Sequence, residues 1–448
     1  MINIFLDKNI LTYINYIFII FVMVLTQLAY EHLIFAFDGA NNKFQYGLIE
    51  TIAQNNKSII INYPSSNITN LTNNNEDSIY GQIAAFENNV YVVWQESVTE
   101  TLPEHNYDIF FTKSKDNGAT FSKVINLSNN SEYSERPQIA VSKNGIFIVW
   151  ADKVNDTNNK QIKFTKSEDN GATFSKVINL SNNSRNSDNP EISSFNENVY
   201  MIWQESDQNI TNSNNNKSVV FKSSFDKGNT FNNSIDVIKN TKDAFPKINS
   251  YGDNVYVVWN NENQNNSGLF LVKSSDKGSN FEKTINLSDN NNSGESQIAV
   301  NKNEVLVVWG GFLAKNIDNI YYVKSNDNGN TFTDSKTISE KIIGSNNTND
   351  EYNKLNEVIN SPLNVEVTYN DNLSFVVWQN TFSKESHDIL LVVLNNQTDN
   401  NFTKLLNLSN NTSISECPSI AFSNNNIYVI WEDFIAGNHE ILFASLAI

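Results

Sequence analysis

A short apolar run that ends in tryptophan recurs seven times along this chain. The first copy is Val90 to Trp94, and successive tryptophans stand 50 to 69 residues apart. The runs are rich in β-branched and aromatic residues, and no long helical pattern separates them. A repeat of this length, built from short strands, indicates one β-sheet per repeat. The tryptophans of the sequence are Trp94, Trp150, Trp203, Trp259, Trp309, Trp378 and Trp431.

Each repeat contains four strand-like segments separated by turns rich in Asn, Gly and Asp. In the second repeat these segments are Gln138 to Val141, Gly145 to Trp150, Gln161 to Lys166 and Lys176 to Leu180. Alternating apolar and polar residues joined by tight turns predict antiparallel hairpins. Four antiparallel strands per repeat are typical of the blades of a β-propeller.

The two ends of the repeat array complete one another. Asn70 stands 13 residues before Ile83, as the end of each fourth strand stands before the next first strand. Residues 65–72 are therefore a fourth strand with no repeat in front of it, while the last repeat, 419–445, has only three strands. Pairing the two leaves no open sheet edge. We predict an all-β, seven-bladed β-propeller of four-stranded antiparallel blades over residues 65–448, closed by its N-terminal strand.

The start of the chain is typical of an export segment. Lys8 precedes the apolar run Ile17 to Leu25, and acidic residues follow that run. We expect residues 1–30 to be a signal peptide or a signal anchor, and residues 31–64 to be a linker or N-terminal extension with one strand-like run, Lys57 to Tyr63. The protein is then extracellular or at the cell surface, and meets a membrane only through such an anchor.

Composition excludes several classes of function. The net charge is −18, with 49 acidic and 31 basic side chains, so the chain would repel the phosphates of a nucleic acid. Cys417 is the only cysteine, so stability must come from packing and ring closure. The four histidines lack metal-ligand spacing, and we expect no metal and no cofactor. Asn-x-Ser/Thr sequons are compatible with glycosylation outside the cell. We expect a monomer.

A second motif recurs between the third and fourth strands of five repeats. Its first copy spans Ser114 to Phe121, and its pattern is Ser-x-Asp-x-Gly-x-Thr-Phe, with Asn in place of Thr in one copy. Asp can accept backbone N–H groups in a turn, Gly supplies positive φ, and the hydroxyls satisfy local backbone groups. We interpret these copies as structural turns. Their aspartates are Asp116, Asp169, Asp226, Asp276 and Asp327.

This motif resembles the Asp-box, or BNR, repeat of sialidases and related β-propellers. The resemblance covers about residues 65–448 and implies that the boxes lie on the face opposite the ligand site. For a sialidase it also implies three arginines that grip the substrate carboxylate, a Tyr/Glu nucleophilic pair and an Asp acid/base. The chain has two arginines and departs from that pattern. Sialidases, other glycoside hydrolases and non-enzymatic receptors share the box, so it does not select one activity.

Candidate ligand-binding residues belong to the face opposite the boxes. Antiparallel order places there the loops after each tryptophan and the loops before each first strand. Arg136 and Arg185 come just before first strands, where a guanidinium could bind a carboxylate or sulfate, or form a surface salt bridge. Carboxylates two residues after tryptophan could do acid/base work on a glycoside, hold a cation, or be solvated turn residues. They are Glu96, Asp152, Glu205 and Asp433.

These observations favour an exported interaction module that binds a glycan or an extracellular protein on that face. The alternative is a sialidase-like exo-glycosidase that uses two carboxylates of the same face. The missing arginine argues against the enzyme, and the acids on one face argue for it. A structural role in a surface layer would also fit the acidity and the sequons. No catalytic residue is identified by the sequence.

Overall fold

The structure of the chain is a computed structural model. It describes residues 32–38, 43–54, 57–63, 68–98, 106–130, 132–154, 159–206, 217–241, 244–261, 268–288, 293–313, 317–338, 362–370, 372–383, 386–395, 406–409, 411, 413–435 and 437–448. The export segment expected at residues 1–30 lies outside this set. Among the described residues there is no helix that could span a lipid bilayer.

The chain divides into two compact units, of which the first comprises residues 1–67 and 446–448. In this unit β1 (His32–Asp38), β2 (Lys43–Gln54) and β3 (Lys57–Tyr63) pair in sequence order as antiparallel neighbours. The run expected at Lys57 to Tyr63 is therefore a strand, and β1 and β2 are strands that the sequence pattern did not indicate.

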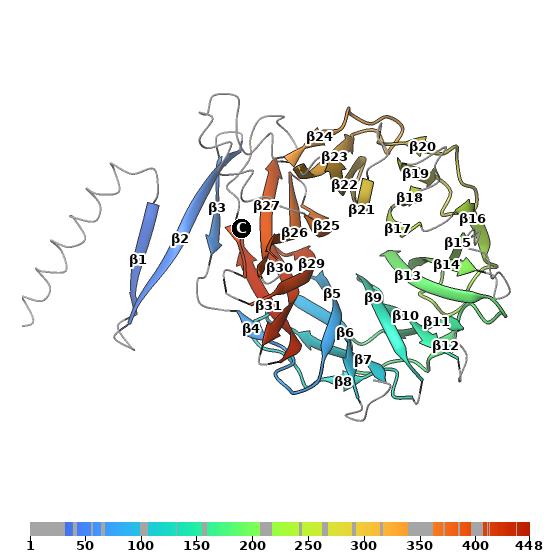
Figure 1. The fold of residues 1–448 in the computed structure, drawn as a ribbon, viewed down its shortest axis with the longest axis horizontal. Coiled ribbons are helices and arrows are strands. Elements are labelled where there is room, and N and C mark those ends of the chain that lie inside the picture. Colours follow the sequence, from blue (N-terminus) through green and yellow to red (C-terminus); the bar gives the residue numbers. More distant parts are fainter. Residues whose placement is uncertain are drawn as a thin grey trace, which may run out of the picture. The chain divides into compact units, whose positions relative to one another are not determined.

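The second unit, residues 68–445, is a ring of seven blades, as predicted (Figure 1). Blades 1 to 3 consist of β5 (Ser78–Phe86), β6 (Asn89–Ser97), β7 (Tyr107–Ser114) and β8 (Ile125–Asn126); β9 (Ser134–Ser142), β10 (Gly145–Lys153), β11 (Lys160–Ser167) and β12 (Ile178–Asn179); β13 (Asn186–Phe195), β14 (Asn198–Ser206), β15 (Lys217–Ser224) and β16 (Ile235–Thr241).

Blades 4 to 6 follow the same antiparallel order. They consist of β17 (Lys247–Tyr251), β18 (Asn254–Asn261), β19 (Gly268–Ser274) and β20 (Ile285–Asn286); β21 (Ser293–Asn301), β22 (Glu304–Leu313), β23 (Ile317–Ser325) and β24 (Lys336–Thr337); β25 (Leu363–Tyr369), β26 (Leu373–Ser383), β27 (Ser386–Asn395) and β28 (Leu406–Asn407). Blade 7 consists of β29 (Ser415–Ser423), β30 (Asn426–Ile435), β31 (Asn438–Ala447) and β4 (Thr69–Asn70).

The ring closes where the first strand of the unit completes the last blade. β4 pairs antiparallel with β31, with Asn70 opposite Leu442 and Thr69 opposite Phe443. The backbone N–H of Leu71 adds a hydrogen bond of 2.9 Å to the carbonyl of Ile441. The predicted closure is confirmed, and it removes the edge that β31 would otherwise present.

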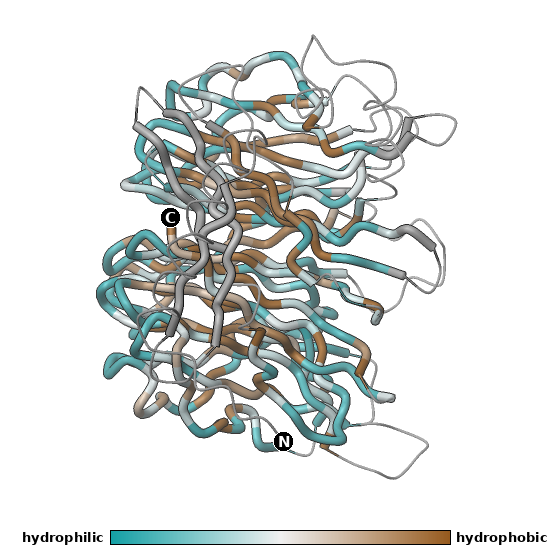
Figure 2. The backbone as a smooth tube through the Cα atoms, turned by 90° about the vertical axis from the view of Figure 1, so that its left-hand side faces the viewer, coloured by the Kyte–Doolittle hydropathy of each residue, from teal (hydrophilic) through white to brown (hydrophobic). Residues whose placement is uncertain are grey.

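The second strand of each blade is buried on both sides, which explains its continuous apolar run. In β6, Val92 and Trp94 pack with blade 7, whereas Tyr91 and Val93 pack with blade 2. Successive side chains of a strand point to opposite faces, so a strand between two neighbouring blades needs apolar residues at every position. Figure 2 shows apolar residues concentrated along the strands and hydrophilic residues in the loops that join them.

The Asp-box aspartate organises the turn that joins strands three and four. Asp116 accepts hydrogen bonds from the backbone N–H of Thr120 at 2.9 Å, from the Thr120 hydroxyl at 2.6 Å and from the Ser114 hydroxyl at 2.7 Å. These hydrogen bonds lower the pKa of Asp116 to about 2, and the bond from the Thr120 hydroxyl has the largest effect. The Ser114 hydroxyl also accepts the N–H of Gly118 at 2.9 Å. The same arrangement recurs at Asp169, Asp226, Asp276 and Asp327.

The box also docks each blade onto the preceding one. In blade 4 the ring of Phe281 meets Phe221 of blade 3 edge to face, with centroids 5.1 Å apart. A Cβ atom on Gly278 would lie 2.3 Å from Phe221, so only glycine allows this approach. The box glycine is therefore fixed by the neighbouring blade as well as by its own φ of +81°. Equivalent close approaches join Gly118 to Phe443, Gly171 to Phe111 and Gly228 to Phe164.

Charged and polar groups join blades 1 and 7 beside the closing strand. The backbone N–H of His439 donates to Asp77 at 2.9 Å, and its Nδ1 lies 2.8 Å from the same carboxylate oxygen. The carboxylate of Glu440 accepts the backbone N–H of Asn74 at 3.1 Å and also bonds the Thr72 hydroxyl. The closure therefore depends on ionisable side chains in addition to strand pairing.

Replacing the glycine of an Asp-box should destabilise the protein more than replacing a glycine of another turn that also has a positive φ. Gly278→Ala must accept both a left-handed φ, at roughly 1–2 kcal/mol, and overpacking against Phe221, at about 1–3 kcal/mol. Gly252→Ala is the matched control, because its φ is +63° and no atom lies within 4 Å of the added Cβ. Urea unfolding of both variants measures the difference. If both variants lose the same free energy of unfolding, the contact between blades does not need glycine.

Removing His439 should weaken the protein in a limited pH range. The hydrogen bond with Asp77 raises the pKa of His439 and lowers the pKa of Asp77. The histidine contribution is complete below its unfolded pKa of about 6.5 and is lost as pH rises through the folded pKa. The aspartate contribution is complete above about 3.9 and is lost as pH falls through the folded pKa.

The difference in melting temperature between wild type and His439→Gln should therefore be largest near pH 5, between about 3.9 and 6.5, and should shrink as pH rises further. Thermal unfolding followed by circular dichroism at several pH values measures it. A difference that stays constant with pH would contradict an ionic role for this pair.

Candidate functional site

The first strand of most blades carries a bulge whose backbone adopts positive φ. The register of β5 against β6 shifts between Ile79 and Gln82, and Tyr80 within this bulge has a φ of 53°. A non-glycine residue in this region is strained by about 1–3 kcal/mol and persists only where its surroundings impose it. Six blades place such a residue at the equivalent position: Tyr80, Arg136, Asn189, Phe245, Asn364 and Cys417.

Polar side chains of the neighbouring blade hold these strained residues. Gln95, directly after Trp94 in blade 1, accepts the backbone N–H of Arg136 in blade 2 at 2.9 Å. The Glu432 carboxylate of blade 7 accepts the N–H of Tyr80 in blade 1 at 2.6 Å. Gln379 of blade 6 does the same for Cys417 of blade 7 at 3.4 Å. In blades 1, 6 and 7 the residue directly after tryptophan therefore holds the strained residue of the next blade.

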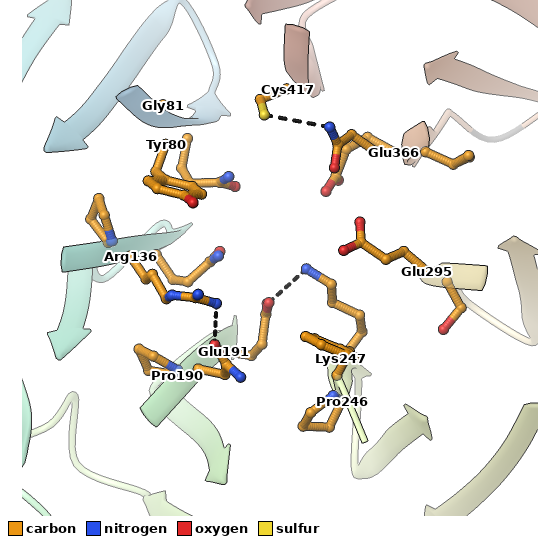
Figure 3. A pocket seen from close by; sticks show the side chains of 18 of the residues that line it. Tyr80, Gly81, Arg136, Pro190, Glu191, Pro246, Lys247, Glu295, Glu366 and Cys417 are labelled. Atoms are coloured by element: carbon orange, nitrogen blue, oxygen red, sulfur yellow. Dashed lines mark hydrogen bonds and ion pairs between the residues drawn. The ribbon is translucent and has the colours of Figure 1, made fainter. Parts of the chain in front are cut away.

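The strained residues line a cavity of about 170 Å³ at the axis of the ring, which we call the charged cavity. All seven blades contribute to its wall through the beginnings of their first strands. Figure 3 shows the side chains of Arg136, Glu191, Lys247, Glu295 and Glu366 grouped around this space. Residues more than 200 positions apart in the sequence thus meet at one site.

A lysine and two glutamates form the interior of the charged cavity. Lys247 Nζ lies 2.7 Å from Glu191 Oε1, and the amide of Gln297 donates to Glu366 at 2.8 Å. Burial raises the pKa of Glu366 to about 7, although Lys247 opposes this rise, so its carboxyl group is partly protonated near neutral pH. Burial also raises the pKa of Glu191. The site therefore holds a carboxyl group of raised pKa beside an ion pair.

Aromatic rings flank the charged groups. The guanidinium of Arg136 lies over the ring of Tyr80, 5.8 Å from its centroid, and donates to the side-chain oxygen of Asn189. Tyr80 is 42% exposed and Phe245 is 40% exposed. Large aromatic side chains beside charged groups give the cavity both apolar and hydrogen-bonding surface.

The four carboxylates that follow tryptophan by two residues lie elsewhere. Glu96 accepts hydrogen bonds from Trp94 Nε1 and the Ser78 hydroxyl, both at 2.9 Å, and from the Asn74 amide at 3.0 Å. Its side chain is buried inside the blade, not solvated in a turn, and it does not line the charged cavity. The same holds for Asp152, Glu205 and Asp433, which bond Trp150, Trp203 and Trp431.

The period of the strand explains this placement. Residues i and i+2 of a strand point to the same face, so a carboxylate two residues after tryptophan points into the blade interface that the indole occupies. The residue directly after tryptophan points to the other face, and Gln95, Gln379 and Glu432 reach the next blade from this position. The sequence signal for residues that reach the next blade is therefore a polar residue directly after tryptophan. Such residues are Gln95, Gln204, Asn260, Gln379 and Glu432.

The two arginines have different environments. Arg136 lines the charged cavity, whereas Arg185 does not and instead pairs with Glu205, with Nη1 2.8 Å from Oε2. The structure therefore brings one of the six candidate ligand-binding residues to the cavity. Among the described residues, no group of three or more His, Cys, Asp or Glu side chains is arranged to hold a metal ion.

Solved structures of sialidases are similar to this chain at low sequence identity. The intramolecular trans-sialidase from Ruminococcus gnavus is 12% identical, with a TM-score of 0.47 and coverage of 83% of this chain and 94% of that one. The NanB sialidase from Streptococcus pneumoniae is 10% identical, with a TM-score of 0.47 and coverage of 90% and 88%. Trypanosoma rangeli sialidase is 10% identical, with a TM-score of 0.42 and coverage of 93% and 59%. No protein-family model and no curated protein matches the chain. The likeness concerns the fold, and no residue role is taken from it.

Substitutions at Asp152 should distinguish a structural hydrogen-bond acceptor from a charged functional group. Burial raises the pKa of Asp152 to about 6, although its bonds with Ser134 and Trp150 oppose this rise. A raised folded pKa means that wild-type stability falls as pH rises between about 3.9 and the folded value. Asp152→Asn keeps an acceptor oxygen and avoids this loss, so it should gain roughly 2 kcal/mol relative to wild type between pH 4 and pH 7.

Asp152→Ala is the matched variant, and it should lose about 1–3 kcal/mol at every pH because it leaves the indole N–H and the Ser134 hydroxyl unpaired. Urea unfolding at both pH values measures the two effects. If Asp152→Asn is as destabilised as Asp152→Ala at pH 7, the negative charge itself is needed.

Proposed function

We propose that this protein is an exported binding module that recognises a glycan through the charged cavity. The observation that carries the proposal is the pairing of half-exposed aromatic rings, Tyr80 and Phe245, with the charged groups of Arg136 and Glu295 around one opening. A sugar ring presents an apolar face and a rim of hydroxyl groups. Aromatic side chains suit the first, and charged hydrogen-bonding groups suit the second.

The size of the cavity supports a glycan over a protein partner. A standard protein interface buries about 800 Å² on each partner over a broad surface. The charged cavity has about 170 Å³, below the roughly 300–1,000 Å³ of pockets for drug-sized ligands. A space of this size suits one sugar unit, such as the end of a glycan chain.

Export and a position at the cell surface are part of the proposal. They are supported by the basic residue and apolar run within residues 1–30, and by the acidic character of the whole chain. The charged cavity contains carboxylates, an arginine and a lysine, so a glycan that bears a charged substituent would find a partner of either sign there.

Glycoside hydrolysis is the second candidate, because the raised pKa of Glu366 suits a general acid. A glycosidase needs one carboxylic acid that protonates the leaving oxygen and one carboxylate on the other side of the bond. Glu366, with its pKa of about 7, suits the first role, and Glu191, which lines the same cavity, is a candidate for the second. Glu191 is paired with Lys247, which lowers its availability as a nucleophile or base. Binding therefore ranks first.

Loss of either exposed aromatic ring should weaken glycan binding. A glycan array with the purified full chain identifies a ligand, and calorimetry then measures its affinity. We expect Tyr80→Ala and Phe245→Ala each to reduce affinity about 10-fold or more, which corresponds to about 1.4 kcal/mol. Phe225→Ala is the matched control: Phe225 is 41% exposed and lies in an Asp-box turn, and its loss should leave the affinity unchanged.

Two outcomes would contradict the binding module. An array without any bound glycan, or equal losses in all three variants, would remove the charged cavity as the site. Turnover of fluorogenic glycosides, sialosides included, that disappears in Glu366→Gln would establish the enzyme instead. In that case the rate should fall as pH rises past about 7, since the acid must be protonated.

A further inference from the structure

The charged cavity has two levels, and each level takes one residue from every blade. The inner level consists of the first-strand residues that pair with the residue directly before tryptophan: Gln82, Gln138, Glu191, Lys247, Gln297, Glu366 and Ser419. The outer level consists of the residues two positions earlier in the chain: Tyr80, Arg136, Asn189, Phe245, Glu295, Asn364 and Cys417. The structure describes every one of these residues, so the charges of both levels are on view.

Positive and negative side chains lie on different sides of these two levels. Arg136 extends from blade 2, whereas Glu295 and Glu366 extend from blades 5 and 6 on the other side of the cavity (Figure 3). The remaining charged residues of the two levels, Glu191 and Lys247, form an ion pair of 2.7 Å. The cavity therefore has a cationic side and an anionic side.

The cationic side already has a partner within the protein. The guanidinium of Arg136 donates to the side-chain oxygen of Asn189. Burial would raise the pKa of Asp188, but the charges of Lys160 and Arg136 lower it. Because Arg136 already stabilises a carboxylate, an anionic ligand gains less from it. The net charge of −18 also repels anions at longer range.

The anionic side has no such compensation. Glu295 is exposed, and its carboxylate forms no hydrogen bond or ion pair with the residues that the structure describes. Burial raises the pKa of Glu366 and of Glu191, and the charge of Glu295 adds to both rises. Carboxylates that disfavour one another's charge favour a ligand that brings a positive charge.

Two neighbours of Glu295 add to the surface that a ligand would meet. Phe245 precedes it in the outer level and is 40% exposed, so its ring can receive the apolar face of a sugar. Ser296 also lines the cavity and is 2% exposed, and its hydroxyl has no hydrogen-bond partner among the described residues. A buried hydroxyl without a partner costs free energy, which a bond to a ligand would recover.

We propose that the charged cavity recognises an amino sugar, with the protonated amino group between Glu295 and Glu366 and the sugar ring against Phe245. The proposal rests on the proposed function, because it names the sugar that the same cavity binds. An ammonium group donates three charge-assisted hydrogen bonds, whereas an N-acetyl group has one N–H and no charge. The anionic side of the cavity therefore selects the free amine, and Arg136 on the other side donates to hydroxyl groups of the sugar.

Calorimetric titration of the full chain with methyl glycosides tests the proposal. Methyl glucosaminide, methyl N-acetylglucosaminide and methyl glucuronide share one sugar ring and differ in charge, and their galacto counterparts are titrated beside them. We expect one of the two amino sugars to bind about 10-fold or more tightly than its N-acetylated form. Its affinity should fall as salt rises from about 50 mM to about 500 mM, because the contact is ionic.

A pair of matched glutamate variants locates the contact. Glu295→Gln keeps the shape of an exposed side chain, and it should weaken binding of the amino sugar about 10-fold or more. Glu197→Gln removes the same charge from the turn between β13 and β14, where Glu197 lies 3.7 Å from Lys227, and should leave the affinity unchanged. Circular dichroism melting verifies that both variants are folded.

Binding of the amino sugar should also release protons near pH 6. At this pH the amino group is protonated, and Glu366, with its pKa of about 7, is largely uncharged. A positive charge beside Glu366 lowers its pKa, so the carboxyl group loses its proton when the ligand binds. Titrations in two buffers of different ionisation enthalpy measure this release, and the N-acetylated sugar should produce none.

Three results would overturn the proposal: no binding of either amino sugar at millimolar concentration, equal affinity for the amine and its N-acetylated form, or equal losses in Glu295→Gln and Glu197→Gln. Preference for a neutral or anionic glycoside that is lost in Phe245→Ala would remove this inference and leave the proposed function intact. An array without any bound glycan would remove the proposed function and this inference with it.

Discussion

Contact between neighbouring blades holds this structure together. A single blade has apolar residues on both faces of its second strand and therefore has no core of its own. The Asp-box supplies the closest part of the contact, because its glycine lets an aromatic ring of the preceding blade approach the backbone. The last such contact, Phe443 of blade 7 against Gly118 of blade 1, lies beside the strand pair that closes the ring. With Cys417 as the only cysteine, packing and closure must supply the stability.

The same contact shapes the centre of the ring. Three residues that directly follow tryptophan, Gln95, Gln379 and Glu432, reach across the blade interface and bond the strained residue of the next blade. The bulges place charged and aromatic side chains at one mouth of the ring, whereas the far ends of the same strands present amides and aromatic rings.

Blade number and closure could be predicted because they depend on local patterns. The recurrence of tryptophan counts the blades, and the fixed offset from Asn70 to Ile83 shows where the ring closes. The site could be predicted only in part. The position of Arg136 before a first strand marks it as a candidate, but Lys247, Glu191 and Glu366 meet through strands from three different blades, and no local pattern reports such a meeting. The carboxylates after tryptophan were plausible from their loop position, yet the two-residue period turns them into the blade.

A crystal structure of the protein with the glycan identified by an array tests the central claim most directly, namely that the ring of strained bulges forms the ligand site. We expect electron density for a sugar unit at the charged cavity, in contact with Tyr80, Arg136 and Phe245. Density confined to the Asp-box turns or to the outer strands, with the charged cavity empty, would contradict it.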